Sequence, residues 1–351
     1  METNLGKFQS DAADAADAAD AADAADAADA ADAASVSGVS SYAGNRTSPL
    51  LTQALWSTYG ELTRGITGTG APNLTLTPLP ANPLGRWSRD VRASMYSFEL
   101  LSKLDFDGNP AVGAAGAPVD ATLTFRDWPK TATSAAPHTH IMKAPAYEAS
   151  LGSLKAELQK VIDKAALRSD RINEILTQVT VPYSFYAMVL NLQPGRHKFT
   201  YEMIATVFRM STAVSMQFKN FFRTRRPADR SALVQPMILT PGHGSYPMGH
   251  AMQSYFIVGV LKKLAGITAG SDAEKQLDRL ADRISENRVI AGLHYPEDTK
   301  AGKELGEALV KYFLFRAGAT DATGNAVDPA AANPTNAAVN WLWTQARTEW
   351  K

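Results

Sequence analysis

The chain contains 351 residues, of which 45% are hydrophobic and 20% charged, so it can bury the core of one large domain or two ordinary ones. This balance excludes a disordered or fibrous protein. Lys and Arg (35 together) equal Asp and Glu (35), so the overall charge indicates no nucleic-acid partner. The absence of cysteine excludes disulfides, thiolate metal sites and a cysteine nucleophile, which leaves His or carboxylate to hold any metal.

The acidic residues are concentrated at the N-terminus. Residues 1–38 contain one base and nine acids, which leaves 34 bases and 26 acids, a net charge of +8, in residues 39–351. An Asp-Ala-Ala triplet repeats eight times between Asp11 and Ala34. A period of three cannot keep the Asp residues on one face of a helix with 3.6 residues per turn. We therefore expect a low-complexity tail over 1–38 and a single domain over 39–351.

The sequence carries no pattern of a targeting or membrane segment. The first residues lack the basic and apolar regions of a signal peptide, and no apolar run approaches the length of about 18 residues that spans a bilayer. We therefore expect a soluble protein, cytoplasmic by default, with no transmembrane segment.

Helical spacing of apolar residues dominates the chain after residue 150. Leu151, Leu154, Leu158 and Val161 illustrate the pattern. Residues 66–86 and 107–150 are instead rich in Gly, Pro, Ala and Thr, which predicts long loops over an all-α body. The predicted helices cover residues 151–165, 172–192, 199–224, 250–265, 272–294, 297–316 and 337–350.

The first motif is a basic segment that runs from Lys219 to Arg226-Pro227. Residues seven apart share a face of a helix, so Lys219 and Arg226 are expected to point the same way. Arg223 and Arg225, between them, suit a solvated basic helix end, which the helix dipole favours.

The second motif is a turn-forming segment, His243-Gly-Ser-Tyr-Pro-Met248-Gly249-His250, which leads directly into an apolar periodic run. We expect a helix to begin at Gly249. The unpaired N–H groups at such a start can cradle an oxyanion, and His250 stands beside them as a candidate acid or base.

The third motif places Arg288, His294 and Asp298 at intervals of six and four residues. Because a residue before proline avoids the α conformation, Pro296 places His294 near a helix end and Asp298 in the first turn of the next helix. A carboxylate there can orient an imidazole ring.

In order, the motifs read Lys-x6-Arg-Pro, Pro-x-Gly-His and Arg-x5-His-x3-Asp. This series resembles the superfamily that joins vanadium-dependent haloperoxidases to type 2 phosphatidic acid phosphatases and bacterial acid phosphatases. The resemblance covers about residues 150–316. It implies an all-α helical bundle of that type with long loop straps.

The resemblance also implies roles for the motif residues. Lys219, Arg226 and Arg288 would neutralise the equatorial oxygens of a bound vanadate or phosphate, helped by the N–H group of Gly249. His294 would bond the central atom, as the ligand of vanadium or as a nucleophile toward phosphorus.

Three further positions follow from the same resemblance. Asp298 would hold His294 in its reactive tautomer, and His250 would serve the apical oxygen or protonate a leaving alcohol. His243 stands where bromoperoxidases have a His near the halide site. Met248 replaces the serine of the family pattern Pro-Ser-Gly-His, so a hydroxyl donor to the oxyanion is missing there.

Three functions follow as expectations. The leading one is a vanadate-dependent haloperoxidase-like enzyme that oxidises bromide or iodide with hydrogen peroxide. The second is a metal-independent acid phosphatase that forms a phosphohistidine at His294, with a phosphomonoester as substrate and phosphate in place of vanadate. The third is a protein that binds phosphate or vanadate without turnover because of Met248. An oligomer is compatible with each function.

Overall fold

The computed structural model describes residues 57–58, 61, 83–108, 120–126, 138–319 and 337–351. These residues fall into two units, of which one contains Trp87–Lys351 and the other contains the short 3-10 helix η1 (Pro83–Arg86). The expected tail over 1–38, its boundary with the domain and the predicted loop over 66–82 lie outside the described residues.

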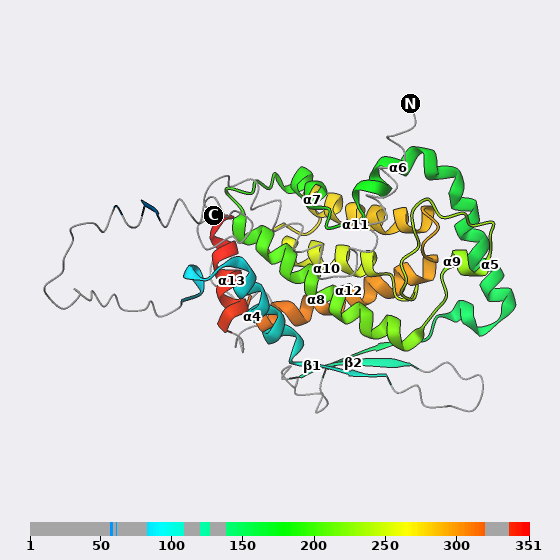
Figure 1. Cartoon of the computed structure of the whole chain (residues 1–351), viewed down its shortest axis with the longest axis horizontal. Coiled ribbons are helices and arrows are strands. Elements are labelled where there is room, and N and C mark those ends of the chain that lie inside the picture. The colour runs from blue at the N-terminus through cyan, green and yellow to red at the C-terminus, as the bar shows by residue number, and fades with distance from the viewer. Residues whose placement is uncertain (1–56, 59–60, 62–82, 109–119, 127–137, 320–336) are drawn as a thin grey trace, which may run out of the picture. The chain divides into compact units, whose positions relative to one another are not determined.

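Helices make up most of the unit Trp87–Lys351 (Figure 1). The helices are α4 (Arg89–Leu101), α5 (Leu151–Asp163), α6 (Arg168–Thr177), α7 (Tyr183–Leu190), α8 (Lys198–Phe222), α9 (Pro227–Arg230), α10 (Gly249–Leu264), α11 (Asp272–Ile290), α12 (Pro296–Ala317) and α13 (Ala337–Thr348). Two 3-10 helices, η2 (Ala146–Ala149) and η3 (Lys164–Leu167), flank α5, and the strands are β1 (Leu104–Asp107), β2 (Ala121–Phe125) and β3 (His138–Met142).

Helix α10 lies at the centre of this body and packs against α8, α11 and α12. Its apolar side chains point in all directions and are buried, as expected for a helix that is covered on every side. The closest packing is with α12, where a Cβ atom on Gly306 would lie only 2.7 Å from the carbonyl oxygen of Met252. Glycine at this contact therefore lets the two helices approach each other.

The predicted helical body is confirmed, with two corrections. The run over 172–192 forms two helices: α6 ends at Thr177, and α7 begins at Tyr183, after Pro182, which disfavours the α conformation of its predecessor and so prevents one continuous helix. The long loop expected over 107–150 contains the strands β2 and β3 and the helix η2.

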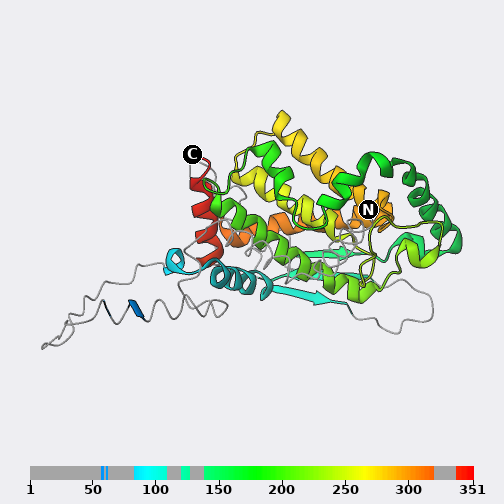
Figure 2. The same cartoon turned by 45° about the horizontal axis from the view of Figure 1, so that its top comes forward.

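The three strands form one antiparallel sheet in the order β1-β2-β3. Ala121, Leu123 and Phe125 on β2 are buried and alternate with half-buried residues, so one face of the sheet packs on the helices. The Phe125 ring stacks on Tyr312 of α12 at 5.0 Å between ring centroids. The sheet lies along the lower edge of the helical body in Figure 1, and in the turned view of Figure 2 part of it lies behind the helices.

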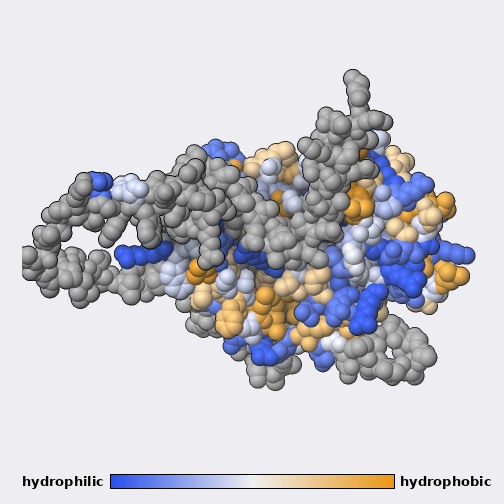
Figure 3. Space-filling model, viewed as in Figure 1, coloured by the Kyte–Doolittle hydropathy of each residue, from blue (hydrophilic) through white to orange (hydrophobic). Residues whose placement is uncertain are grey.

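On the face shown in Figure 3, hydrophilic and hydrophobic patches of the described residues are interspersed. None of the helices in the described ranges is both long enough and apolar enough to span a bilayer.

Candidate functional site

Seven residues of the three motifs line one cavity. It lies where the end of α8, the N-terminus of α10 and the segment between α11 and α12 meet. Its volume is about 50 Å³, and because one water needs about 10–15 Å³ by this measure, it has room for about four waters or one small oxyanion. The motif residues in its wall are Lys219, Arg226, His243, Gly249, His250, Arg288 and His294.

Lys219 and Arg226 reach the cavity from different backbone segments. The expectation that they share a helix face is wrong, because α8 ends just before Arg223, which adopts a left-handed conformation (φ 49°). Arg226 then precedes the short helix α9. The Nζ atom of Lys219 donates to the carbonyl oxygens of Gly244 (2.8 Å) and Ser245 (3.0 Å). The second motif therefore holds the first cation in place.

The buried guanidinium of Arg226 joins the second motif to the third. Its Nε atom donates to the carbonyl oxygen of His243 at 3.1 Å, and Nη1 donates to that of Leu293 at 3.0 Å. Burial lowers the pKa of Arg226 to about 10, so it remains positively charged near neutral pH.

Helix α10 begins at Gly249, as predicted, with Met248 as its N-cap. The backbone N–H of Met248 donates to the carbonyl oxygen of Asp298 at 3.0 Å, and Gly302 packs so closely that a Cβ atom would collide with the Met248 carbonyl oxygen. The starts of α10 and α12 are thus fixed to each other. The first N–H groups of α10 have no partner within the helix. Gly249, the first residue of α10, lines the cavity, so the positive end of the helix dipole lies there.

The segment between α11 and α12 carries His294. Helix α11 ends at Ile290 rather than at residue 294, because Gly292 adopts a positive φ (84°) that continues no helix. Pro296 occupies the first position of α12 and Asp298 the third, so the predicted placement of Asp298 in the first turn is confirmed.

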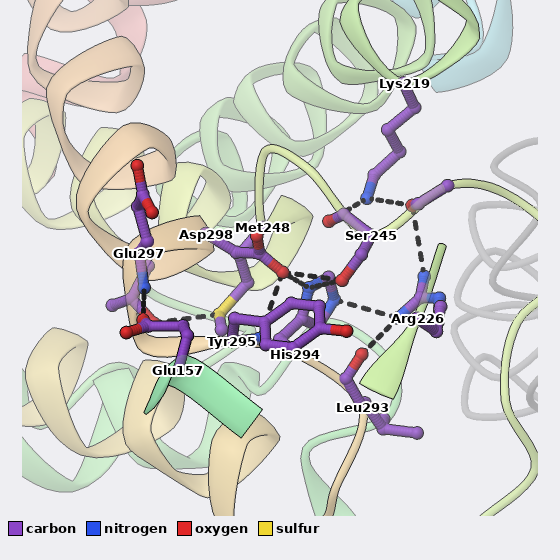
Figure 4. Close-up of polar contacts among 12 residues, drawn as sticks. Glu157, Lys219, Arg226, Ser245, Met248, Leu293, His294, Tyr295, Glu297 and Asp298 are labelled. Carbon is purple, nitrogen blue, oxygen red and sulfur yellow. Dashed lines mark hydrogen bonds and ion pairs between the residues drawn. The ribbon is translucent and has the colours of Figure 1, made fainter. Parts of the chain in front are cut away.

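The hydrogen bonds of His294 define its tautomer (Figure 4). Its Nδ1 atom lies 3.0 Å from Oδ2 of Asp298, and its Nε2 atom lies 3.0 Å from Nη1 of Arg226. A guanidinium only donates, so Nε2 accepts and the ring proton resides on Nδ1, where it is donated to the carboxylate. The lone pair of Nε2, the nitrogen that faces away from Asp298, therefore accepts from Arg226.

Asp298 is buried and accepts from several donors. Ser245 Oγ donates to Oδ2 at 2.5 Å, the Tyr295 N–H donates to Oδ2 at 3.1 Å, and Tyr147 OH donates to Oδ1 at 2.7 Å. Burial raises the pKa of the Asp298 carboxyl, and these hydrogen bonds oppose that rise. With so many donors fixed around it, the carboxylate cannot rotate, and neither can the imidazole of His294.

Sequence reasoning missed two of these donors. Ser245 lies in the second motif between His243 and Gly249, so its position in that segment was an available signal. Tyr147 lies about 150 residues before Asp298 in the chain, and no local pattern connects the two.

Arg288 is the least satisfied charged group in the cavity wall. It is 1% exposed, and its Nη2 atom donates to the Ile175 carbonyl oxygen at 2.7 Å. Its Nε and Nη1 atoms have no hydrogen-bond partner among the described residues. Burial lowers its pKa to about 10, which still leaves it charged near neutral pH. A buried guanidinium with two free donors is costly unless an acceptor enters the cavity.

The three histidines of the cavity are neutral near pH 7. Burial lowers the pKa of His243 to about 3 and of His250 to about 3, and it lowers the pKa of His294 well below its usual range. The Nε2 atom of His250 lies 3.0 Å from the Gln178 carbonyl oxygen, to which it must donate.

Met248 is buried in an apolar cluster that includes Tyr147, Val161 and Tyr295, and it does not line the cavity. It therefore neither supplies nor blocks a donor there. A hydroxyl that the sequence analysis missed does line it: Ser215 lies one turn before Lys219 on α8, on the same helix face. It is fully buried, and a hydroxyl can turn toward a bound acceptor.

The cavity carries an excess of positive charge. Lys219, Arg226 and Arg288 are each at most 2% exposed, and among the described residues Asp298 is the one acid that forms a hydrogen bond with a side chain of the cavity wall. With neutral histidines, and with Lys219 and Asp298 both ionised, three cations and one carboxylate give a net charge of about +2. Burial and the nearby Arg226 lower the pKa of Lys219 well below its usual range, an effect that a bound anion would reverse.

No protein-family model matches the chain, and no curated protein sequence matches it either. A small cavity with three cations, a helix N-terminus and a histidine lone pair can hold a compact oxyanion and present one nitrogen to its central atom.

Proposed function

We propose that the protein is a vanadate-dependent haloperoxidase-like enzyme of the haloperoxidase and type 2 phosphatidic acid phosphatase type, which oxidises bromide or iodide with hydrogen peroxide. The observation that carries this proposal is Arg288, which lines a cavity with room for one small oxyanion and has two buried donors without a partner among the described residues. The helical body and the order of the three motifs support it.

Vanadate fits the residues of the cavity. Its negative charge would offset the net charge of about +2, and its oxygens would accept from Lys219, Arg226, Arg288 and the N–H group of Gly249. His294 would supply a nitrogen ligand through Nε2 once Nη1 of Arg226 donates to a vanadate oxygen in place of that nitrogen, with Asp298 holding the opposite nitrogen.

Bound vanadate would activate the peroxide as a Lewis acid, and the oxidation state of the vanadium would not change. The protein's own contribution is electrostatic. The three cations and the α10 N-terminus are held in place before any substrate arrives, so they stabilise developing negative charge without reorganisation. In the overall reaction the halide loses two electrons and gains an oxygen atom from peroxide, whose other oxygen leaves as water after taking up a proton.

One observation favours this function over the acid phosphatase. A phosphatase needs His250 as a charged general acid, whereas its Nε2–H is donated to the Gln178 carbonyl and burial lowers its pKa to about 3.

A paired assay tests the proposal. One vanadate-titrated preparation is followed for peroxide-dependent bromide and iodide oxidation and for hydrolysis of p-nitrophenyl phosphate, while equilibrium dialysis measures bound vanadate. His294→Ala should abolish halide oxidation, whereas His140→Ala on β3, which does not line the cavity, should retain it. Phosphatase activity that vanadate inhibits would overturn the proposal. Vanadate binding without either activity would identify an oxyanion-binding protein without turnover.

A further inference from the structure

A second, larger pocket adjoins the oxyanion cavity. Its volume is about 700 Å³, and it shares Met216, Lys219, Arg226, Pro241 and His243 with the wall of the small cavity. We call it the vestibule. Because the small cavity has room for little more than an oxyanion, any organic molecule that reacts there must occupy the vestibule, whose volume is typical of a small-molecule site.

The wall of the vestibule is strongly cationic. Arg223 and Arg225 are exposed and line it together with the buried Lys219 and Arg226, and Asp229 is the one acid among its lining residues. Asp229 already accepts the backbone N–H of Arg226 at 3.0 Å. Arg225 forms no hydrogen bond or ion pair within the part of the chain that the structure describes, so its guanidinium is free to meet a ligand.

The backbone holds Arg223 at this place in an unfavourable conformation. It adopts φ 49° at the end of α8, a position at which glycine or asparagine is usual because a Cβ atom is strained there. Its Nε atom donates to the Asn220 carbonyl oxygen at 3.0 Å, which leaves its two terminal nitrogens available at the vestibule. Neither arginine forms an ion pair with an acidic residue of the described ranges.

We propose that the vestibule binds an organic halogen acceptor that carries an anionic substituent, such as a carboxylate, and that Arg223 and Arg225 hold this substituent. The inference rests on the proposed function, because that function supplies the hypohalous equivalent. In the reaction a carbon of the acceptor bonds to the electrophilic halogen, the oxygen–halogen bond breaks, and the proton that this carbon loses leaves with hydroxide as water. The apolar surface of Met216 and Pro241 would lie against the organic part.

A competition experiment tests this inference. The vanadate-loaded enzyme receives bromide, peroxide and equal amounts of 3-(4-hydroxyphenyl)propionate and its amide, which share one ring and differ in a single charge. The ratio of brominated acid to brominated amide is compared with the ratio that reagent hypobromous acid gives. Because both acceptors use the same bromide oxidation, its rate cancels in the ratio.

The wild type should favour the acid by about fivefold or more over the reagent at low ionic strength, as two arginine–carboxylate contacts allow. The double variant Arg223→Gln, Arg225→Gln should fall to the reagent ratio. The matched control Lys275→Gln, Arg279→Gln removes two exposed cations of α11 that line neither pocket, and it should keep the wild-type ratio. A wild-type ratio equal to that of the reagent would overturn the inference.

A binding measurement separates this inference from the proposed function. Protein saturated with phosphate is titrated with the acid and with the amide, and NMR line widths of the two compounds report binding. If bromide oxidation is absent, the proposed function has failed, and the titration alone decides about the vestibule. Tighter binding of the acid that the Arg223 and Arg225 variant loses supports the anionic site, whereas equal binding of both compounds overturns it.

Discussion

The Nδ1 atom of His294 lies 3.0 Å from Oδ2 of Asp298, while Nη1 of Arg226 lies 3.0 Å from Nε2 on the other side of the ring. The imidazole is therefore fixed at both nitrogens, with its proton on the side of the carboxylate. Asp298 is in turn fixed by Ser245 and Tyr147. This chain of contacts gives Asp298 a positioning role, since it faces His294 and not the cavity.

Replacing Asp298 with Asn should remove the acceptor that fixes the tautomer of His294. We expect halide oxidation to fall about a hundredfold or more, as when the orienting carboxylate of a catalytic histidine is replaced by an amide. Vanadate binding should weaken as well, because Nε2 is then protonated in part of the molecules. Nitrogen-15 NMR of the histidine ring reports the tautomer directly. An unchanged tautomer with normal activity would contradict the role, and Asp278→Asn on α11 is the surface control.

Ser215→Ala tests whether the buried hydroxyl on α8 contributes to the oxyanion site. A hydrogen bond to a charged group contributes about 1.5–3 kcal/mol, so phosphate or vanadate affinity should fall about tenfold or more. Titration calorimetry measures this affinity. Ser211→Ala is the matched control, because Ser211 is equally buried one turn earlier on α8 but does not line the cavity. Equal affinities for both variants would remove Ser215 from the site.

The elements and the site differ in how well the sequence predicted them. Helical periodicity placed α5, α8, α10, α11, α12 and α13 within a few residues, because each helix buries an apolar face. The residues that end helices account for most of the errors: Pro182 separates α6 from α7, and Gly292 ends α11 early. The short sheet escaped prediction since its strands lie in a segment rich in loop-forming residues.

The motif residues were predicted to meet, and the structure brings them to one cavity. For Lys219 and Arg226 the reason differs from the predicted one, which was a shared helix face. Lys219 and Arg226 converge although α8 ends between them, because the Gly244 and Ser245 carbonyls hold the lysine and the third motif holds the arginine. Tyr147 could not be predicted at all, since its contact with Asp298 depends on tertiary packing.

Acidification should destabilise the protein through its buried histidines. The pKa of His250 is about 3 in the folded protein, whereas it is about 6.5 in an unfolded chain. Between these values the unfolded chain binds the additional proton, so stability is lost as the pH falls below about 6.5, by about 1.4 kcal/mol per pH unit for each such group. His250→Gln should flatten this dependence by about one proton. Denaturant unfolding at pH 7, 6 and 5 in buffer without oxyanions measures this dependence. If the free energy of unfolding changed equally with pH in the wild type and the variant, His250 would not be neutral and buried in the folded protein.

Arg288→Met should separate stability from anion binding. In buffer without oxyanions the variant should be as stable as the wild type or more stable by about 1–4 kcal/mol, because it removes a buried charge whose Nε and Nη1 donors are unsatisfied. Phosphate at a hundred times its Kd should stabilise the wild type by about 2.7 kcal/mol. The same phosphate concentration should stabilise the variant far less, because the site has lost one of its three cations. Thermal unfolding with and without phosphate measures both effects.

Arg283→Met, on the same helix but paired with Glu174 at the surface, should keep the full phosphate response. A variant that is strongly destabilised without phosphate, yet still responds to it, would show that Arg288 supports the fold and not the anion.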